Sequence, residues 1–211
     1  QYARIVSMRK IITTTMLTLD GVMQAPGGSK EDAAEGFKYG GWQGGYWGED
    51  GDKIMDTKIQ AAPFDLLFGR LTYDIFAGYW PHHKTEPHWG KPFDRAKKYV
   101  VSHKPFALSW DNSVLITGDV VAEIKKLKHS DGPDLLIYGS SNLIQTLLKH
   151  NLIDRMHIWT FPVTIGNGKK LFAEGTRPEL FKQVDAKITS TGIIFATYEP
   201  SSPLKKGRIT E

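Results

Sequence analysis

The sequence of 211 residues contains no cysteine, which excludes disulfide bonds and catalysis by a thiol. It also contains no apolar run of about 18 residues, the length that a membrane-spanning helix needs. The N-terminus lacks the charged, apolar and small-residue regions of a secretory signal. We therefore expect a soluble, cytoplasmic protein without a membrane partner.

The excess of positive over negative charge is also small, since the net charge is only +4. Part of this excess lies in the C-terminal sequence PLKKGRITE, which carries Lys205, Lys206 and Arg208. A nucleic-acid site typically interleaves basic and aromatic residues on one face or belongs to a known module, and neither pattern is present. We expect no nucleic-acid partner and interpret residues 201–211 as a basic, solvated tail.

A single domain is expected between the two termini. Hydrophobic residues make up 40% of the chain, which is enough for one core, and no linker divides the sequence. Residues 1–7 carry no pattern that joins them to the rest of the chain, so we interpret them as a non-native or disordered extension. The predicted domain covers residues 8–200.

Short apolar segments alternate with amphipathic segments along this domain. Segments rich in β-branched and aromatic residues predict strands at 10–19, 64–69, 98–102, 113–117, 134–139, 154–166 and 192–200. Helical spacing of apolar residues predicts helices at 52–62, after Gly69, from Val120 to before Gly132, and at 140–151. This alternation indicates an α/β fold with a mostly parallel sheet covered on both faces. The last two strands lack a helix between them, so we expect them to pair antiparallel.

Two junctions between a predicted strand and the following helix share a pattern of glycine and hydroxyl residues. These residues are Gly69, Arg70 and Thr72 in LLFGRLTY, and Gly139, Ser140, Ser141 and Asn142 in LLIYGSSNL. Helix N-termini at the carboxyl ends of strands present unpaired N–H groups and favour phosphate. The alternative is that glycine only turns the chain and serine only caps the helix.

A third strand end adds Ser102, His103 and Lys104 at the same edge of the predicted sheet. Three phosphate-compatible strand ends suggest a dinucleotide with an additional phosphate. The sequence has no G-x-G-x-x-G fingerprint, no P-loop and no G-x-S-x-G nucleophile motif. A dinucleotide site here is therefore of another type than the Rossmann site.

Five motifs in order give the sequence a resemblance to a known family. They are TLDG at 18–21, LLFGRLTY at 66–73, KYVVSHK at 98–104, LLIYGSSNLIQTLL at 135–148 and LIDRMHIWTFPVTIGNGKKLF at 152–172. The chain resembles the dihydrofolate reductase superfamily, in the branch related to the C-terminal reductase domain of riboflavin biosynthesis. The resemblance implies a three-layer α/β/α sandwich around a mixed, mostly parallel sheet, and NADPH as hydride donor to a C=N or C=O carbon of a small heterocycle.

The resemblance also assigns roles to the residues of the three strand ends. Gly69, Arg70 and Thr72 match the G-R-x-T helix start at the cofactor phosphates, and Ser102, His103 and Lys104 match the strand end that receives the 2′-phosphate. Gly139, Ser140 and Ser141 match the turn at the pyrophosphate, although Ser140 replaces the second glycine of the family.

Two carboxylates are the candidate catalytic residues. Asp20 matches an aspartate that riboflavin-type reductases place beside the substrate, where it accepts hydrogen bonds or supplies a proton. An Asp-Gly turn is its structural alternative. Folate reductases carry a further carboxylate on the helix before G-R-x-T, and of the acidic residues between 49 and 56 we select Asp52.

Aromatic residues follow the first predicted strand within a glycine-rich loop that can serve as a substrate lid. Trp42, Tyr46 and Trp47 of this loop, with Tyr79 and Trp80, suggest stacking on a planar ring, and ordinary packing or an interface is the alternative. The histidines of PHHKTEPH, at 82, 83 and 88, lack a scaffold for metal ligation, and we expect no metal.

The resemblance further implies a homodimer. The alternative function is a nucleotide-binding regulatory protein that has lost catalysis.

Overall fold

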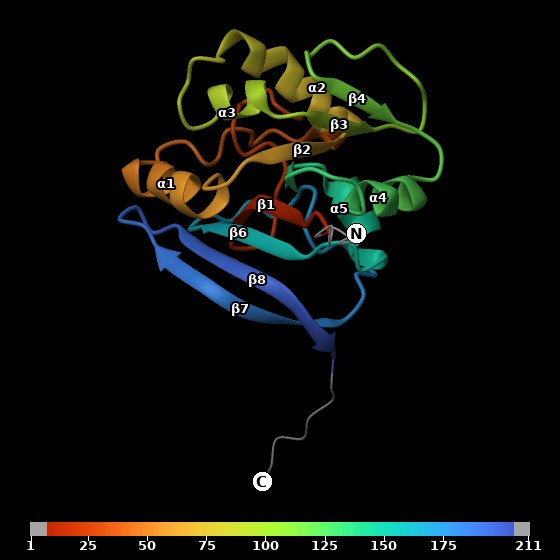
Figure 1. The fold of residues 1–211 in the computed structure, drawn as a ribbon. Helices are drawn as coiled ribbons and strands as arrows, with labels where there is room; N and C mark the ends of the chain where they lie inside the picture. The colour runs from red at the N-terminus through yellow and green to blue at the C-terminus, as the bar shows by residue number, and fades with distance from the viewer. Residues whose placement is uncertain (1–7, 205–211) are drawn as a thin grey trace.

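One mixed sheet organises the residues that the structure describes, 8–204 of a computed structural model (Figure 1). Its strands are β1 (Ile11–Thr18), β2 (Phe64–Gly69), β3 (Lys98–Val101), β4 (Ser113–Ile116), β5 (Asp134–Tyr138), β6 (Arg155–Phe161), β7 (Glu179–Ile188) and β8 (Ile194–Pro203). They lie in the order β4-β3-β2-β5-β1-β6-β8-β7. The strands from β4 to β6 in this order pair parallel, whereas β8 pairs antiparallel with both β6 and β7. The predicted antiparallel pairing of the last two expected strands, β6 and β8, is confirmed.

Helices cover both faces of the sheet, which confirms the α/β sandwich. The helical elements are α1 (Glu49–Ile54), the π-helical turn η2 (Met55–Ile59), α2 (Arg70–Tyr79), α3 (Gly90–Arg95), α4 (Val120–Lys128) and α5 (Ser141–Lys149), with short 3-10 turns η1 (Ala34–Gly36) and η3 (Trp80–His82). Residues of α1, η2, α2 and α3 pack in one apolar cluster, and residues of α4 and α5 pack in a second. These two clusters are the two interfaces of a three-layer arrangement.

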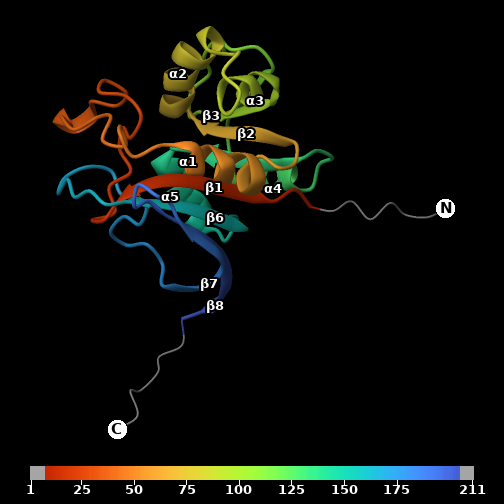
Figure 2. The ribbon, with the colours of Figure 1, turned by 90° about the vertical axis from the view of Figure 1, so that its left-hand side faces the viewer.

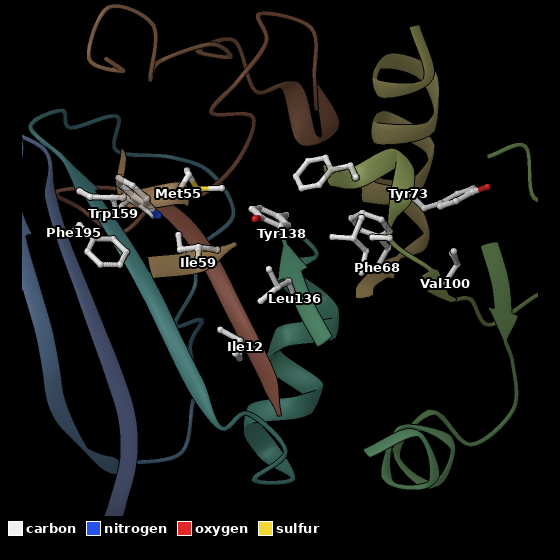
Figure 3. Close-up of a cluster of buried hydrophobic side chains, with 14 of the residues drawn as sticks. Ile12, Met55, Ile59, Phe68, Tyr73, Val100, Leu136, Tyr138, Trp159 and Phe195 are labelled. Carbon is white, nitrogen blue, oxygen red and sulfur yellow. The ribbon is translucent and has the colours of Figure 1, made fainter. Parts of the chain in front are cut away.

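The cluster beneath α1, η2 and α2 is rich in aromatic side chains (Figure 3). Met55 and Ile59 pack over Trp159 of β6 and Phe195 of β8, and Trp159 and Phe195 lie 4.8 Å apart between ring centroids. The π-helical turn is closed by a bond from Gln60 N to Met55 O of 2.8 Å. This layer supports the loops that surround the carboxyl ends of the strands.

Several boundaries and elements differ from the sequence-based expectation. Strand β6 ends at Phe161 because Pro162 follows and cannot donate to the ladder. The short helix α3 was not predicted, because its sequence GKPFDR contains both glycine and proline. The edge strand β7 was also not predicted, because Lys182, Gln183, Asp185 and Lys187 interrupt its apolar residues. Strand β8 continues to Pro203, beyond the predicted domain boundary at residue 200.

The predicted extension at residues 1–7 and most of the predicted basic tail lie outside the described residues. Among residues 8–204, no helix has both the length and the apolar character needed to cross a membrane.

Candidate functional site

The carboxyl ends of the parallel strands lie at one edge of the sheet, together with the longest loops (Figure 2). The segment between β1 and α1 and the segment between β6 and β7 both extend beyond this edge. Gly69, Ser102 and Gly139 follow or end β2, β3 and β5, which are neighbours in the sheet. The structure therefore brings the three predicted strand ends together.

The junctions after β2 and β5 are joined by hydrogen bonds. Gly69 N donates to Ser140 Oγ at 3.0 Å, and Ser140 N donates to Thr72 Oγ1 at 2.9 Å. The Ser140 hydroxyl also donates to Tyr138 O at 3.3 Å. Ser140 has a left-handed backbone with φ of 55°, and its side chain is buried. The hydroxyl of Ser140 is thus engaged within the protein, in a role that sequence reasoning did not anticipate.

Gly139 is required by the close approach of these two junctions. Its φ is +58°, a region that favours glycine, and a Cβ atom at this position would lie 3.1 Å from Thr72 Oγ1. A larger residue would push apart the starts of α2 and α5. The two helix starts consequently lie side by side.

Both helix starts present backbone N–H groups toward this edge. Within residues 8–204, no side chain accepts a capping hydrogen bond from the first turn of α2 or of α5. The first N–H groups of a helix need external acceptors, and the helix dipole makes the site favourable for an anion. Ser141 and Asn142 begin α5, so the predicted phosphate-binding residues lie where an anion is electrostatically favoured.

Arg70 lies at the start of α2 with its guanidinium group partly solvent-exposed. Its Cζ atom lies 3.5 Å from the centre of the Phe106 ring, and Nε lies 2.7 Å from Asp74 Oδ2. Phe106 belongs to the segment after Ser102, His103 and Lys104. Arg70 is therefore adjacent to the third strand end, as expected, but its charge is partly offset by Asp74.

The strand end after β3 is a hydroxyl-stabilised turn. Ser102 Oγ donates to Lys104 O at 2.7 Å and accepts from Lys104 N at 3.3 Å. Ser102 is buried, whereas the side chains of His103 and Lys104 are exposed. Two basic side chains are thus available to solvent at the outer end of the site.

Asp20 lies after β1 and anchors the segment that follows β6. Its carboxylate accepts hydrogen bonds from Thr18 Oγ1 at 2.6 Å and from Gly166 N at 2.6 Å, with a longer bond from Ile165 N. The Thr18 bond, together with the backbone bonds, lowers the pKa of Asp20 to about 2. A carboxylate with this pKa is ionised at neutral pH and holds no proton to donate. The geometry favours the structural role that Asp-Gly turns suggest.

Asp52 lies on α1 beside the aromatic residues of the long loop. Its Oδ1 accepts from Trp47 Nε1 at 2.8 Å. The Trp47 ring lies 5.3 Å from Trp89 and 4.9 Å from Trp159, measured between centroids. Trp89 in turn packs against Tyr138 at the end of β5, at 5.9 Å. An aromatic wall therefore extends from α1 to the strand end that carries Gly139.

Neighbouring segments contact α1 and η2 through Asp50 of α1 and Asp56 of η2. Asp50 Oδ2 accepts from Ser190 N and Ser190 Oγ in the β7–β8 turn. Asp56 Oδ1 lies 3.0 Å from His88 Nδ1, and this contact raises the pKa of His88. Sequence reasoning gave no signal for either contact, because each joins segments far apart in the chain.

The predicted histidine cluster is divided between different partners. His83 Nδ1 lies 2.9 Å from Tyr79 O and its ring stacks on Tyr79 at 4.0 Å, whereas His88 contacts Asp56. In the part of the chain from 8 to 204, no three His, Asp or Glu side chains are grouped as a metal site.

Comparisons with known proteins agree with this architecture. The family described as the RibD C-terminal domain matches residues 9–195. An uncharacterized protein of Bacillus subtilis, YyaP, is 27% identical over 198 residues, which are 90% of this chain and 94% of the relative.

Solved structures show the same fold. A putative riboflavin biosynthesis protein from Shewanella sp. PV-4 superposes with a TM-score of 0.65 and 22% identity, over 91% of this chain and 99% of the other. The dihydrofolate reductase of Enterococcus faecalis, complexed with NADP(H), superposes with a TM-score of 0.58 and 14% identity, over 92% and 97% of the two chains. The family match spans most of the chain and all three strand ends, and so the protein belongs to the RibD C-terminal domain family.

Proposed function

We propose that the protein is an NADPH-dependent reductase whose cofactor lies across the carboxyl ends of β2, β3 and β5. The observation that carries this proposal is the pair of helix starts, α2 and α5, held side by side by Ser140 and Thr72. Neither start has a side-chain cap within the described residues, so both suit the negatively charged pyrophosphate. Family membership and the likeness to a reductase complexed with NADP(H) support the same cofactor.

The residues at this edge fit the chemistry of NADPH. Ser141 and Asn142 at the start of α5 would hold the pyrophosphate through backbone N–H groups. Lys104 and His103 would bind the 2′-phosphate that distinguishes NADPH from NADH, and Arg70 would support them. When bound, the cofactor supplies a hydride to an electrophilic carbon.

The substrate side is proposed to lie along α1 and the aromatic wall. Asp52 offers a carboxylate for hydrogen bonds from a ring N–H group, and the surrounding tryptophans offer stacking surfaces. A small heterocycle with a C=N or C=O carbon, similar to a pterin or a riboflavin precursor, suits these groups. Asp20 would shape the pocket wall through the 165–166 segment.

Measuring NADPH oxidation with a panel of pterins, riboflavin precursors and quinones tests this function. We expect turnover with at least one heterocycle and a much lower rate with NADH. Calorimetric binding of NADPH is measured in parallel. Tight NADPH binding without turnover on any member would favour the alternative of a regulatory nucleotide-binding protein, and no binding of either cofactor would refute the proposed site.

We also propose a homodimer. Strand β7 lies at the edge of the sheet, and its Val184 and Ile188 side chains are 43% and 75% exposed. Apolar side chains on an unpaired edge favour association with another chain. Sedimentation equilibrium measures the mass directly, and a monomer at micromolar concentration would contradict this proposal.

A further inference from the structure

Trp47 makes the contacts that a bound planar heterocycle would make in the proposed substrate site. Its ring nitrogen donates to Asp52 Oδ1 at 2.8 Å. Its ring packs against two other indoles, at 5.3 Å and 59° to Trp89 and at 4.9 Å and 43° to Trp159. Indole is itself a flat, bicyclic nitrogen heterocycle with one N–H donor.

The helix surface beneath the indole is shaped to accept a flat ring. A Cβ atom at Gly51 would lie 2.9 Å from Cε2 and 3.1 Å from Cδ2 of Trp47. Because contacts below 3.0 Å require a shift, Gly51 allows the ring to lie directly against α1. Any other residue at this position would displace the ring from Asp52.

Glycine residues flank Trp47 in the chain and leave space beside its backbone. Gly44 and Gly45 precede it and Gly48 follows it, and Gly45 has φ of +81°. An added Cβ atom at Gly45 or Gly48 would meet no atom within 4 Å, so there is open space beside the chain on both sides of Trp47, while Gly48 O accepts hydrogen bonds from Gly51 N and Asp52 N. Trp47 itself is only partly buried, in contrast to Trp159, which is fully buried.

We infer that Trp47 is an internal plug that occupies the position of the substrate ring. The substrate is a planar heterocycle with a ring N–H group, which displaces the indole, takes over its hydrogen bond to Asp52 and packs against Trp89 and Trp159. This inference rests on the proposed function, since it assigns the ring-binding part of that site. Trp47 then lowers the affinity for substrate, because its indole and the substrate ring compete for the same position.

The first test uses indole as the ligand of a Trp47→Ala variant. Calorimetry is expected to show binding of indole to this variant and none to the wild-type protein. Benzothiophene, a planar bicycle of similar size without an N–H donor, should bind about tenfold more weakly, because a hydrogen bond to a charged group is lost. Adding Asp52→Asn should remove most of this preference. Equal binding of the two ligands to Trp47→Ala would overturn the inference.

The second test keeps an aromatic ring at position 47 and removes only the donor. In Trp47→Phe the plug loses its bond to Asp52, so pterin should bind with a dissociation constant about tenfold lower than for the wild-type protein. Tyr39→Phe is the matched control, because it also removes one side-chain donor from the same loop, and Tyr39 is exposed and packs against Phe37. Its pterin affinity should equal that of the wild-type protein.

These binding measurements separate the plug from the proposed function. An unchanged or weaker pterin affinity in Trp47→Phe overturns the plug, even if the protein oxidises NADPH with a substrate. A tighter affinity in Trp47→Phe alone supports the plug, even if no member of the substrate panel is reduced.

Discussion

The backbone nitrogen of Gly69 donates to the hydroxyl of Ser140, 71 positions later in the sequence, at 3.0 Å. This bond joins the end of β2 to the start of α5, and the return bond from Ser140 N to Thr72 Oγ1 closes the link at 2.9 Å. The spacing of the two proposed phosphate-binding helix starts therefore depends on two hydroxyl groups. Stability and cofactor affinity are coupled at this point.

Replacing Thr72 with valine keeps the volume of the side chain and removes the acceptor for Ser140 N. We expect the free energy of unfolding to fall by about 1–3 kcal/mol, because a partly buried N–H group loses its partner. The dissociation constant for NADPH should rise as the start of α5 loses its fixed position. Urea denaturation and calorimetry measure the two quantities.

Thr146→Val is the matched control for this substitution. Thr146 Oγ1 donates to Asn142 O at 3.0 Å on the exposed side of α5, where water replaces the lost bond. Its unfolding free energy should change by less than about 0.5 kcal/mol. If the two valine variants were equally stable and bound NADPH equally well, the link between the junctions would have no energetic role.

Lys104 is predicted to set the preference for NADPH over NADH. A charge-assisted contact to the 2′-phosphate is lost in Lys104→Ala, so the dissociation constant for NADPH should rise about tenfold while that for NADH stays within about twofold. Arg70→Ala should have a smaller selective effect, because Asp74 already pairs with that guanidinium group. Titrations with both cofactors measure the ratio.

A parallel loss of NADH affinity in Lys104→Ala would show that this residue holds the fold or the pyrophosphate. A wild-type preference for NADH would refute the assignment of the β3 strand end.

The sheet and the strand ends could be predicted from the sequence, because an apolar run and the residues that end it are neighbours in the chain. The strand at 64–69 was predicted with the observed bounds, since its apolar run begins after Pro63 and ends at Gly69. Strand β7 was not predicted, because charged and polar residues interrupt its apolar residues and leave no continuous hydrophobic signal. The Gly69–Ser140 bond and the Trp47–Asp52 bond could not be predicted from the sequence. A hydroxyl or an indole nitrogen has many equally plausible partners before the chain is folded.

Asp20 is predicted to contribute to stability through the turn that it holds. Its folded pKa of about 2 lies below the ordinary value of 3.8, so its contribution is fully present above pH 3.8 and is lost as the pH falls through 2. Asp20→Asn should lower the free energy of unfolding at neutral pH. It should also reduce the fall of this free energy between pH 3.8 and 2, and urea denaturation at each pH measures both changes. It should reduce turnover and thermal stability together.

A large loss of turnover in Asp20→Asn with unchanged stability would instead indicate direct contact with the substrate. Kinetic and thermal measurements on the same preparation distinguish the two results.

His157 is predicted to make the protein sensitive to mild acid. The ring is buried in β6, lies 2.9 Å from Thr197 Oγ1 and stacks on Phe195 at 5.6 Å. Burial, with the nearby Arg155, lowers its pKa from 6.5 to about 4. The neutral ring therefore makes its full contribution to the free energy of unfolding above pH 6.5. This contribution is lost as the pH falls toward 4, because the unfolded chain takes up the proton first.

The wild-type protein should lose up to about 3 kcal/mol of unfolding free energy across this interval through His157 alone. His157→Gln is expected to be less stable at pH 7 and to show a correspondingly smaller change between pH 6.5 and 4. His129→Gln is the control, because this exposed histidine lies at the end of α4 and its ring Nδ1 lies 2.6 Å from a backbone oxygen, Lys125 O. Burial is what opposes the protonation of His157. If the unfolding free energy of His157→Gln changed as much between pH 6.5 and 4 as that of the wild-type protein, the acid-sensitive group would lie elsewhere.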